Sequence, residues 1–257
     1  MAIKLKSRRE IELLRRAGAI CHQVLSRLGE IVAPGVTTAQ LDGEAERLTA
    51  ELSAEALFKG VPGQGGPFPG TICASINEQV VHGIPSDRAI RDGDLVSVDY
   101  GCRLDGYCGD AATTFMVGDV GQGPRRLVSA TRRALETAVE LAGSNRLWSD
   151  VARRMQEYVE GQGFSVIRKF VGHGIGKEMH EDPKVPNFVS KELLARDILL
   201  EEGLVIAVEP MVSMGTPEVM MENDGWTIVT KDRKPSAHFE HVLAVTAEGV
   251  QVLTDGS

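Results

Sequence analysis

Four segments of the chain carry apolar residues at the three- and four-residue spacing of an amphipathic helix. These segments are residues 7–30, 38–53, 124–142 and 149–161. Pro34-Gly35 ends the first, and Thr37-Thr38 can cap the second because threonine hydroxyls accept hydrogen bonds from free backbone N–H groups. The pattern therefore predicts four helices, which fall in two pairs.

Runs of apolar and β-branched residues between the helix pairs predict strands. They are TICASI, LVSVDYG and AATTFMVG in the first part, then FSVIRKFVG, GLVIAVEPM, GWTIVT and HFEHVLAVT in the second. Residues 60–70 are rich in glycine and proline and predict a loop. The order of helices followed by strands occurs twice. It predicts an α+β fold in which residues 1–257 form one domain, with halves of about 1–118 and 119–257 around a central curved antiparallel sheet.

Two aspartates flank a predicted β-hairpin. Asp105-Gly106 between two strand-like runs is a strong signal for a two-residue turn. That turn places Gly101 opposite Asp110. Because side chains alternate along a strand, Asp99 and Asp110 then project from the same face. Two carboxylates so close together require a cation between them.

A glycine-rich stretch, GHGIGKEMHEDP, follows the predicted strand FSVIRKFV. We expect its glycines to let the backbone lie close to a ligand while His173 projects from the end of a rigid strand. A lone histidine is more often structural than functional. A second one, His180, seven residues further on, favours a functional site.

Two glutamates complete the set of unusual polar residues. Glu209 ends the apolar run LVIAV, and Glu240 lies in HFEHVLAV, where we expect it to share a strand face with His238. Four carboxylates and one imidazole balance the charge of two divalent cations. Such a ligand set suits Mn²⁺, Fe²⁺, Co²⁺ or Zn²⁺ without selecting one of them. Two metals can activate water to attack a carbonyl or a phosphate, and the scarcity of nearby lysine and arginine favours peptide hydrolysis.

Charge and composition narrow the partners and the compartment. The net charge of −8 and pI of about 5.3 disfavour anionic membranes, and we expect no specific nucleic-acid partner. Apolar runs are too short to span a bilayer, and the basic start MAIKLKSRRE is not followed by the apolar stretch of a secretory signal. Four cysteines without a CxxC pair indicate a reduced, cytoplasmic setting.

Five motifs in order resemble the type I methionine aminopeptidases, over about residues 7 to 255. They are NEQVVHGIP, VDYGCRLDGYCGD, GHGIGKEMHEDP, VEPM and DGWTIVTKDRKPSAHFEH. The resemblance implies the pita-bread fold, with its pseudo-twofold α/β architecture, and two divalent metal ions. It also implies their ligands: Asp110 and Glu240 bridge both metals, Asp99 holds one with both oxygens, and His173 and Glu209 complete the other.

The same resemblance implies the roles of residues that contact substrate. His82 lies near the scissile nitrogen, His180 lies near the carbonyl oxygen, and Glu209 is also the proton shuttle. The side-chain pocket would be lined by Phe68, Cys73, Met179 and Trp226. Met179 stands where a phenylalanine is common, which affects the shape of the pocket rather than the hydrolysis.

The implied activity is removal of the first methionine from nascent chains whose second residue is small. We expect a monomer, and contact with the ribosome surface stays open. Two alternatives share the fold. One is a proline-directed aminopeptidase or dipeptidase, although such enzymes usually carry an additional amino-terminal domain for which this chain has no room. The other is a non-catalytic protein that binds peptides or RNA, which would be free to lose metal ligands.

Overall fold

The computed structural model describes residues 3–143 and 145–256. Its helices are α1 (Arg8–Ile31), α2 (Thr38–Glu51), α3 (Gln122–Leu141), α4 (Trp148–Gly161) and the short α5 (Lys191–Ala195). The first four lie close to the predicted ranges. The side chain of Ser7 accepts a hydrogen bond from the backbone of Glu10, whose carboxylate accepts one in return, and Thr37 and Gln40 cap α2 in the same way. Local sequence thus fixes where both helices begin.

Fifteen strands occur within the described residues and form four small sheets. They are β1 (Glu55–Ala56), β2 (Cys73–Ile76), β3 (Gln79–Val81), β4 (Leu95–Leu104), β5 (Tyr107–Met116), β6 (Ser165–Val166), β7 (Gly172–Gly174), β8 (Glu181–Val185), β9 (Val205–Val208), β10 (Met211–Ser213), β11 (Val219–Met221), β12 (Ile228–Thr230), β13 (Ser236–His238), β14 (His241–Thr246) and β15 (Gly249–Val252). The orders are β1-β4-β2 with β5 on β4, β13-β10-β6, β11-β12-β3 and β15-β14-β9-β7-β8.

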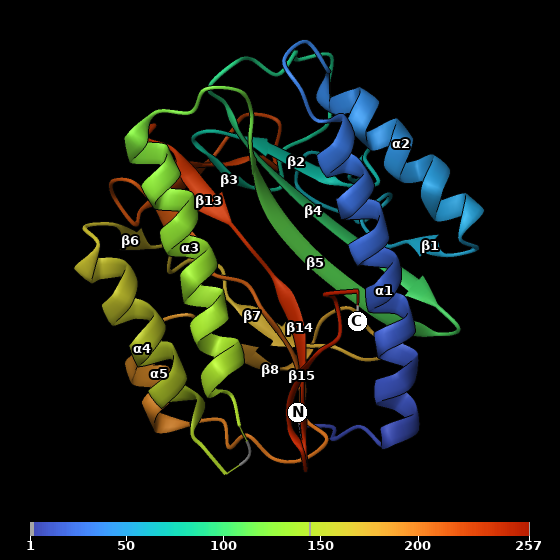
Figure 1. Cartoon of the computed structure of the whole chain (residues 1–257), viewed down its shortest axis with the longest axis vertical. Coiled ribbons are helices and arrows are strands. Elements are labelled where there is room, and N and C mark those ends of the chain that lie inside the picture. The colour runs from blue at the N-terminus through green and yellow to red at the C-terminus, as the bar shows by residue number, and fades with distance from the viewer. Residues whose placement is uncertain (1–2, 144, 257) are drawn as a thin grey trace.

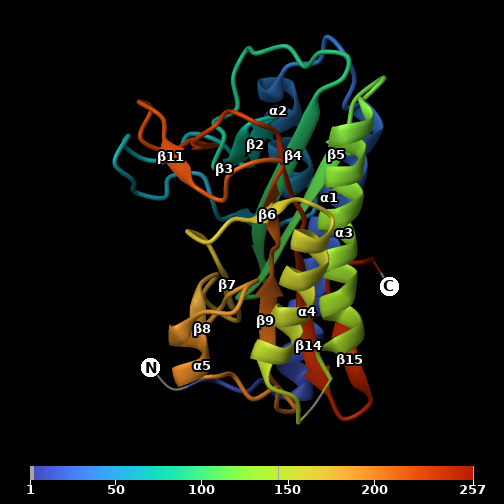
Figure 2. The same cartoon turned by 90° about the vertical axis from the view of Figure 1, so that its left-hand side faces the viewer.

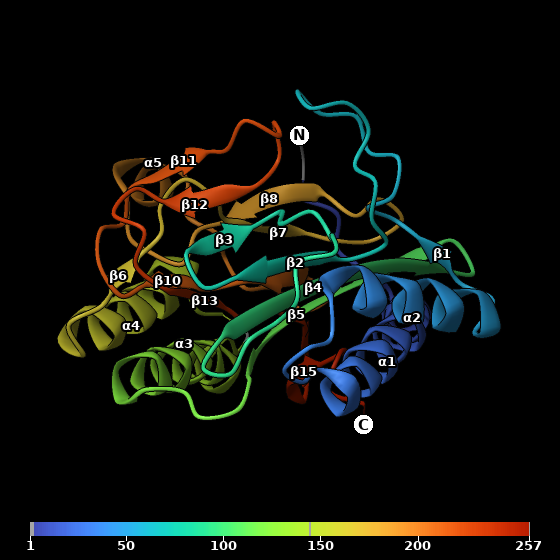
Figure 3. The same cartoon turned by 90° about the horizontal axis from the view of Figure 1, so that it is seen from above.

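The four long helices cover one face of the strands. Figure 1 shows α1 and α2 on one side of this face and α3 and α4 on the other. In Figure 2, α3 lies on the opposite side of the molecule from β8 and β11. Seen from above, strands β3, β8, β11 and β12 and their loops lie on the side away from the long helices (Figure 3). The functional site described below is on this second side.

Each helix pair has its own apolar core. Leu28 and Tyr100 belong to a cluster built from α1, α2, β2 and β4, whereas Leu127 and Trp148 belong to one built from α3, α4, β9 and β14. Burial of each such side chain contributes about 1.5–3 kcal/mol relative to exposure. The two cores match the predicted halves, while the division near residue 118 itself stays a prediction.

The halves meet where β5 passes the chain that leaves β13. Ala112 of β5 forms an isolated antiparallel bridge with Glu240. Thr114 holds the neighbouring backbone, since its hydroxyl donates to the carbonyl of His238 at 2.7 Å and accepts from the N–H of His238 at 2.9 Å. Strands from the two halves are thereby joined at the residues that carry the polar site.

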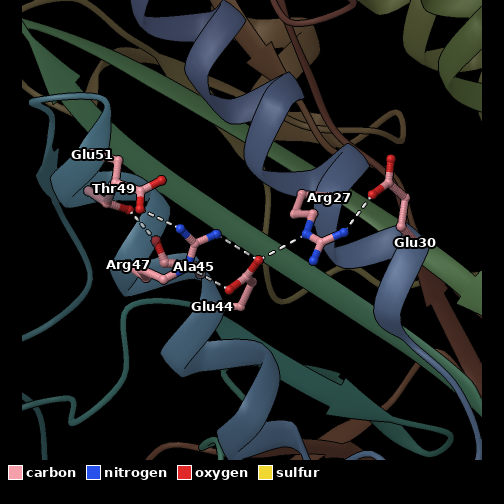
Figure 4. Close-up of polar contacts among 7 residues, drawn as sticks. All are labelled: Arg27, Glu30, Glu44, Ala45, Arg47, Thr49 and Glu51. Atoms are coloured by element: carbon pink, nitrogen blue, oxygen red, sulfur yellow. Dashed lines mark hydrogen bonds and ion pairs between the residues drawn. The ribbon is translucent and has the colours of Figure 1, made fainter.

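A chain of ion pairs links α1 to α2 on the surface (Figure 4). Arg27 pairs with Glu30 at 2.8 Å and with Glu44 of α2 at 2.9 Å, and Glu44 also accepts from Arg47 at 2.8 Å. Because the arginines are half exposed, salt weakens these pairs and their contribution is modest. The network supports a helix contact that the apolar core already fixes.

Three predicted strands are interrupted. Within GLVIAVEPM, β9 ends at Val208 and Met211 begins β10 in another sheet. In and just after FSVIRKFVG, only Ser165–Val166 and Gly172–Gly174 are strands. The prediction of a single rigid strand before His173 is therefore wrong. Within HFEHVLAVT the chain leaves β13 at His238 and enters β14 at His241, which belongs to another sheet. In all three cases the chain passes from one sheet to another, and the residues at the crossing cannot continue either ladder. No helix of the described chain is long and apolar enough to cross a membrane.

Candidate metal centre

The predicted hairpin holds both aspartates on one face. Leu104 pairs with Tyr107, Gly101 with Asp110 and Asp99 with Ala112, which confirms the predicted register. The turn residue Asp105 has a φ of 50° and Gly106 one of 81°, as the favoured two-residue turn requires. Asp99 and Asp110 therefore reach the same cavity from adjacent strands.

The other three residues come from the second half of the chain. His173 lies in β7 and pairs with Ala207 of β9, and Glu209 follows the end of β9. Glu240 reaches the same place through its bridge with Ala112 of β5. All five side chains line one cavity of about 490 Å³ on the face opposite the long helices.

Short distances connect these groups. Ligand atoms of Asp110, His173 and Glu240 all lie within 4.8 Å of one another. Nε2 of His173 lies 3.6 Å from Oδ2 of Asp110 and 3.8 Å from Oε1 of Glu209. Asp99 stands on the neighbouring strand, beside Asp110. The structure thus brings together all five residues that the sequence singles out.

The carboxylates crowd one another in a buried site. Burial raises the pKa of Asp99 to about 7. Burial, together with the charge of Asp99, also raises the pKa values of Asp110, Glu209 and Glu240 well above their ordinary range. Among the described residues, no lysine or arginine lines the cavity. A protein that concentrates negative charge without a cationic side chain needs another source of positive charge.

Several oxygens of the site lack a hydrogen-bond partner. They are Oδ1 of Asp99, Oδ1 of Asp110 and Oε1 of Glu240, all buried. Buried polar atoms are rarely left unpaired, and carboxylate oxygens beside an imidazole are ordinary ligands of divalent transition metals. The residues present therefore fit divalent cations.

The imidazole of His173 is oriented for this role. Its Nδ1 lies 3.0 Å from the carbonyl oxygen of Gly174, and a carbonyl can only accept, so Nδ1 carries the proton and Nε2 keeps its lone pair. Burial, followed by the nearby His180, lowers the pKa of His173 to about 4. A neutral imidazole with a free Nε2 is the form that binds metal.

The glycines around His173 serve packing rather than a ligand. A Cβ atom on Gly172 would lie 2.2 Å from the carbonyl oxygen of Ala207, and one on Gly174 would lie 2.2 Å from that of Asp182. The expectation that these glycines bring the backbone close to a ligand is therefore wrong. They allow β7 to fit between its neighbouring strands, and this fit positions His173.

An apolar pocket adjoins the polar cluster. Phe68, Cys73, Met179 and Trp226 all line the cavity, and the rings of Phe68 and Trp226 meet edge to face at 5.1 Å. The glycine-rich loop packs over this pocket, because Trp226 Nε1 donates to the carbonyl of Gly66 at 3.0 Å. The structure thus brings these four residues together in one cavity.

Sequence reasoning missed Phe58 in this pocket. Its side chain is buried with Phe68 and Cys73, and Met179 packs against them. A Cβ on Gly101 would lie 2.8 Å from the Phe58 ring and 3.1 Å from the Met179 sulfur, so the glycine makes room for both. The one signal in the sequence was Gly101, which shares a strand face with Asp99. It indicates space for a neighbouring side chain, but only the structure shows that this side chain is Phe58.

Two further histidines border the site. His82 lies against Phe170 and Trp226, with ring centroids 5.5 Å and 6.2 Å away, and His180 lies 4.3 Å from His173. The backbone of His82 has a φ of 59°, in the left-handed region that costs a non-glycine residue about 1–3 kcal/mol. Strain of this kind is typical of positions at which function fixes a side chain.

The loop that carries Met179 and His180 is tied to the rest of the chain by Glu181. Lys6 donates to its carboxylate at 2.6 Å, and the backbone N–H groups of Lys177 and Glu178 donate at 3.1 and 3.3 Å. Burial alone would raise the pKa of Glu181, but these hydrogen bonds and the lysine charges lower it overall. The negative form of Glu181 is the one that holds the loop.

Replacement of Glu181 by glutamine should loosen that loop. We expect the free energy of unfolding at pH 7 to fall by about 1 kcal/mol, because a charged hydrogen bond is lost, and kcat/KM for peptides to fall several-fold. Since the folded pKa is lowered, the stabilisation is present above the ordinary pKa of 4.5 and is lost as the pH falls through the folded value. Thermal melts from pH 7 to 3 should show the two proteins converging. Glu178→Gln, in the same loop but exposed, is the control, and equal effects of both substitutions would contradict this role.

Comparison with known proteins shows which family of metal-dependent peptidases the chain belongs to. Residues 12–247 match the model of metallopeptidase family M24, and the chain belongs to that family.

More specific relatives carry the name methionine aminopeptidase. The chain is 44% identical over 252 residues to the methionine aminopeptidase of Clostridium perfringens, covering 98% of both chains. It is 40% identical to methionine aminopeptidase 1 of Bacillus subtilis, over 97% of this chain and 98% of the relative. The solved structure of the methionine aminopeptidase of Thermotoga maritima superposes with a TM-score of 0.92 at 38% identity, covering 98% of this chain and 99% of that one.

Structures of proline-specific relatives share the fold at lower identity. The prolidase of Pyrococcus furiosus superposes with a TM-score of 0.77 at 22% identity, and this chain covers 65% of it. That likeness supports the pita-bread architecture. The full-length similarity to the methionine aminopeptidases disfavours both alternatives considered from the sequence.

Proposed function

We propose that this chain is a methionine aminopeptidase that uses two divalent cations to hydrolyse the bond after an N-terminal methionine when the second residue is small. One observation carries the proposal: four carboxylates, buried in Asp110 and Glu240 and half-buried in Asp99 and Glu209, meet a neutral imidazole beside an apolar pocket, with no cationic side chain lining the described part of the cavity. Relatives that match nearly the whole chain bear the same enzyme name.

The five polar residues would hold the cations. Asp110 and Glu240, whose ligand atoms lie within 4.8 Å of each other and of His173, would serve both ions, and Asp99 would hold one of them. His173 and Glu209 would hold the other. Cations at this place would supply the Lewis acidity that polarises a peptide carbonyl and lowers the pKa of water. Mn²⁺, Fe²⁺, Co²⁺ and Zn²⁺ all fit this donor set.

The remaining site residues act on the substrate directly. Glu209 would take a proton from the attacking water and pass it to the leaving amine, the general acid–base role of a carboxylate within reach of both. His180 donates a hydrogen bond to the carbonyl oxygen as negative charge develops there. His82 contacts the scissile nitrogen. Phe68, Cys73, Met179 and Trp226 enclose the methionine side chain, together with Phe58.

Replacement of Met179 by phenylalanine should narrow the choice of first residue. A methionine side chain is flexible, so the native pocket adapts to leucine or norleucine more readily than a rigid ring would allow. We expect the ratio of kcat/KM for Met-Ala-Ser over Leu-Ala-Ser to rise several-fold in the variant. Apolar pockets discriminate to about this extent between substrates that differ by one methylene group. Met220→Phe, on the exposed strand β11, is the control. An unchanged ratio would mean that Met179 does not line the pocket.

The cellular setting follows from the same proposal. We further propose that the enzyme acts in the cytoplasm, as a monomer, on the N-termini of nascent chains. The ribosome surface is a further partner to test. All four cysteines are free and buried, in agreement with a reducing compartment.

The decisive assay measures methionine release from purified protein stripped of metal and reloaded with each cation in turn. We expect release from Met-Ala and Met-Pro peptides, little release from Leu-Ala, and no cleavage of an X-Pro panel that lacks methionine. Preference for the X-Pro panel would favour the proline-directed alternative. Absence of cleavage with every cation, in protein that binds metal, would favour a non-catalytic role.

A further inference from the structure

His238 is a buried polar residue without a hydrogen-bond partner on Nε2. It ends strand β13 and is 2% exposed, and its Nε2 belongs to the buried atoms of the described structure that have no partner. The backbone on which it stands is rigid, because Thr114 both donates to and accepts from it. Buried polar nitrogens normally have a hydrogen-bond partner, so we expect an acceptor near Nε2 of His238.

The carboxylate of Glu209 lies close to this nitrogen. Nε2 of His238 lies 3.9 Å from Oε2 of Glu209, while Nε2 of His173 lies 3.8 Å from the other oxygen, Oε1. The backbone of Glu209 is also held, since Nδ2 of Asn187 donates to its carbonyl at 3.0 Å. The carboxylate thus lies between two imidazoles, one on each oxygen.

Only one of the two imidazoles can donate to Glu209. His173 uses its Nδ1–H on the carbonyl of Gly174, so its Nε2 has no proton to give. His238 has no such restriction on Nε2. A side-chain rotation that shortens the separation from Oε2 by about 1 Å produces an ordinary hydrogen bond.

We propose that His238 is a positioning residue: its Nε2–H donates to Oε2 of Glu209 and fixes the rotation of that carboxylate, so that Oε1 stays directed toward the side of His173. The inference rests on the proposed function, in which Glu209 both binds metal and moves a proton. A carboxylate with two tasks needs its two oxygens to remain distinct. A donor on one oxygen alone achieves this.

Substitution at this position separates positioning from packing. His238→Leu keeps the bulk and removes the donor, and we expect kcat to fall roughly 10- to 100-fold, the loss typical of a hydrogen bond to a charged group. KM and the number of bound metal equivalents should stay near the wild-type values. His238→Gln places an amide N–H at a similar reach and should recover most of the lost kcat, whereas the shorter His238→Asn should not. If the leucine variant does not fold, the comparison of glutamine with asparagine decides.

A spectroscopic test is independent of metal and of turnover. In ¹⁵N-histidine NMR of the metal-free protein, we expect His238 to carry its proton on Nε2 and this signal to shift in Glu209→Gln. It should not shift in Glu46→Gln, a control on the exposed face of α2. Wild-type kcat in His238→Leu, equal kcat in the glutamine and leucine variants, or a His238 signal that ignores Glu209→Gln would overturn the inference. Failure of the proposed function is a different result, namely wild-type protein that binds metal but cleaves no methionyl peptide.

Discussion

Asp110→Asn should lower peptidase activity by more than about 100-fold, because loss of even an outer-shell partner of a metal ligand costs 10- to 100-fold. Asp110 belongs to the compact group with His173 and Glu240, and it is the residue proposed to touch both cations. Metal analysis of the purified variant should show less than the full complement. Two equivalents retained with normal turnover would contradict the assignment.

Although Asp110→Asn should lower activity, it should raise the stability of the metal-free protein. In the metal-free protein, burial and then the charge of Asp99 disfavour the ionised form of Asp110 and raise its pKa. Asparagine avoids this cost and preserves the shape of the side chain. We therefore expect metal-free Asp110→Asn to unfold at a higher temperature than the metal-free wild type, and to gain less stability when Mn²⁺ is added. Asp119→Asn, at an exposed ion pair with Arg125, is the matched control and should behave as wild type in both assays.

His180→Ala should reduce kcat by about 10²–10³-fold, the effect of losing one donor to a developing oxyanion. The ring of His180 lies 4.3 Å from that of His173, yet it is not among the three side chains whose ligand atoms converge. Metal content should therefore stay normal. If the variant loses a metal ion, His180 is a ligand rather than a substrate contact.

A second variant of His180 tests whether the reaction requires an imidazole or only a hydrogen-bond donor at this position. His180→Gln retains an N–H donor and should recover part of the lost turnover. His22→Ala, on the exposed face of α1, controls for the removal of an imidazole and should leave kcat unchanged. Identical losses in His180→Ala and His180→Gln would mean that the imidazole itself, and not merely a donor, is required.

Local patterns predicted the helices and the hairpin because their causes are local. Ser7 and Thr37 cap α1 and α2 through residues three positions ahead, and Asp105-Gly106 sets the register of β4 and β5 through its own backbone angles. That register alone places Asp99 and Asp110 on one face. The placement of the two aspartates of the site could thus be predicted without knowledge of any tertiary contact.

The remaining half depended on contacts that no local pattern contains. The strand predicted before His173 is broken, and the run from His238 to Glu240 crosses between sheets, because each segment must satisfy two different neighbours. The roles of Gly172 and Gly174 also depended on tertiary contacts, because a Cβ atom at either position would meet the backbone of a neighbouring strand, at Ala207 or Asp182.

The sequence by itself determined the kind of residues that form the site and the charge they must share. Four carboxylates and an imidazole in apolar surroundings require cations wherever the chain places them. Only the tertiary structure decided which groups touch. Phe58 packs in the pocket because Gly101 leaves room for it, and His238 faces Glu209 at the junction of the two halves, where Thr114 of the first half holds its backbone. Composition fixes the charge of a buried site, whereas hydrogen bonds across that junction, absent from any local segment, fix its geometry.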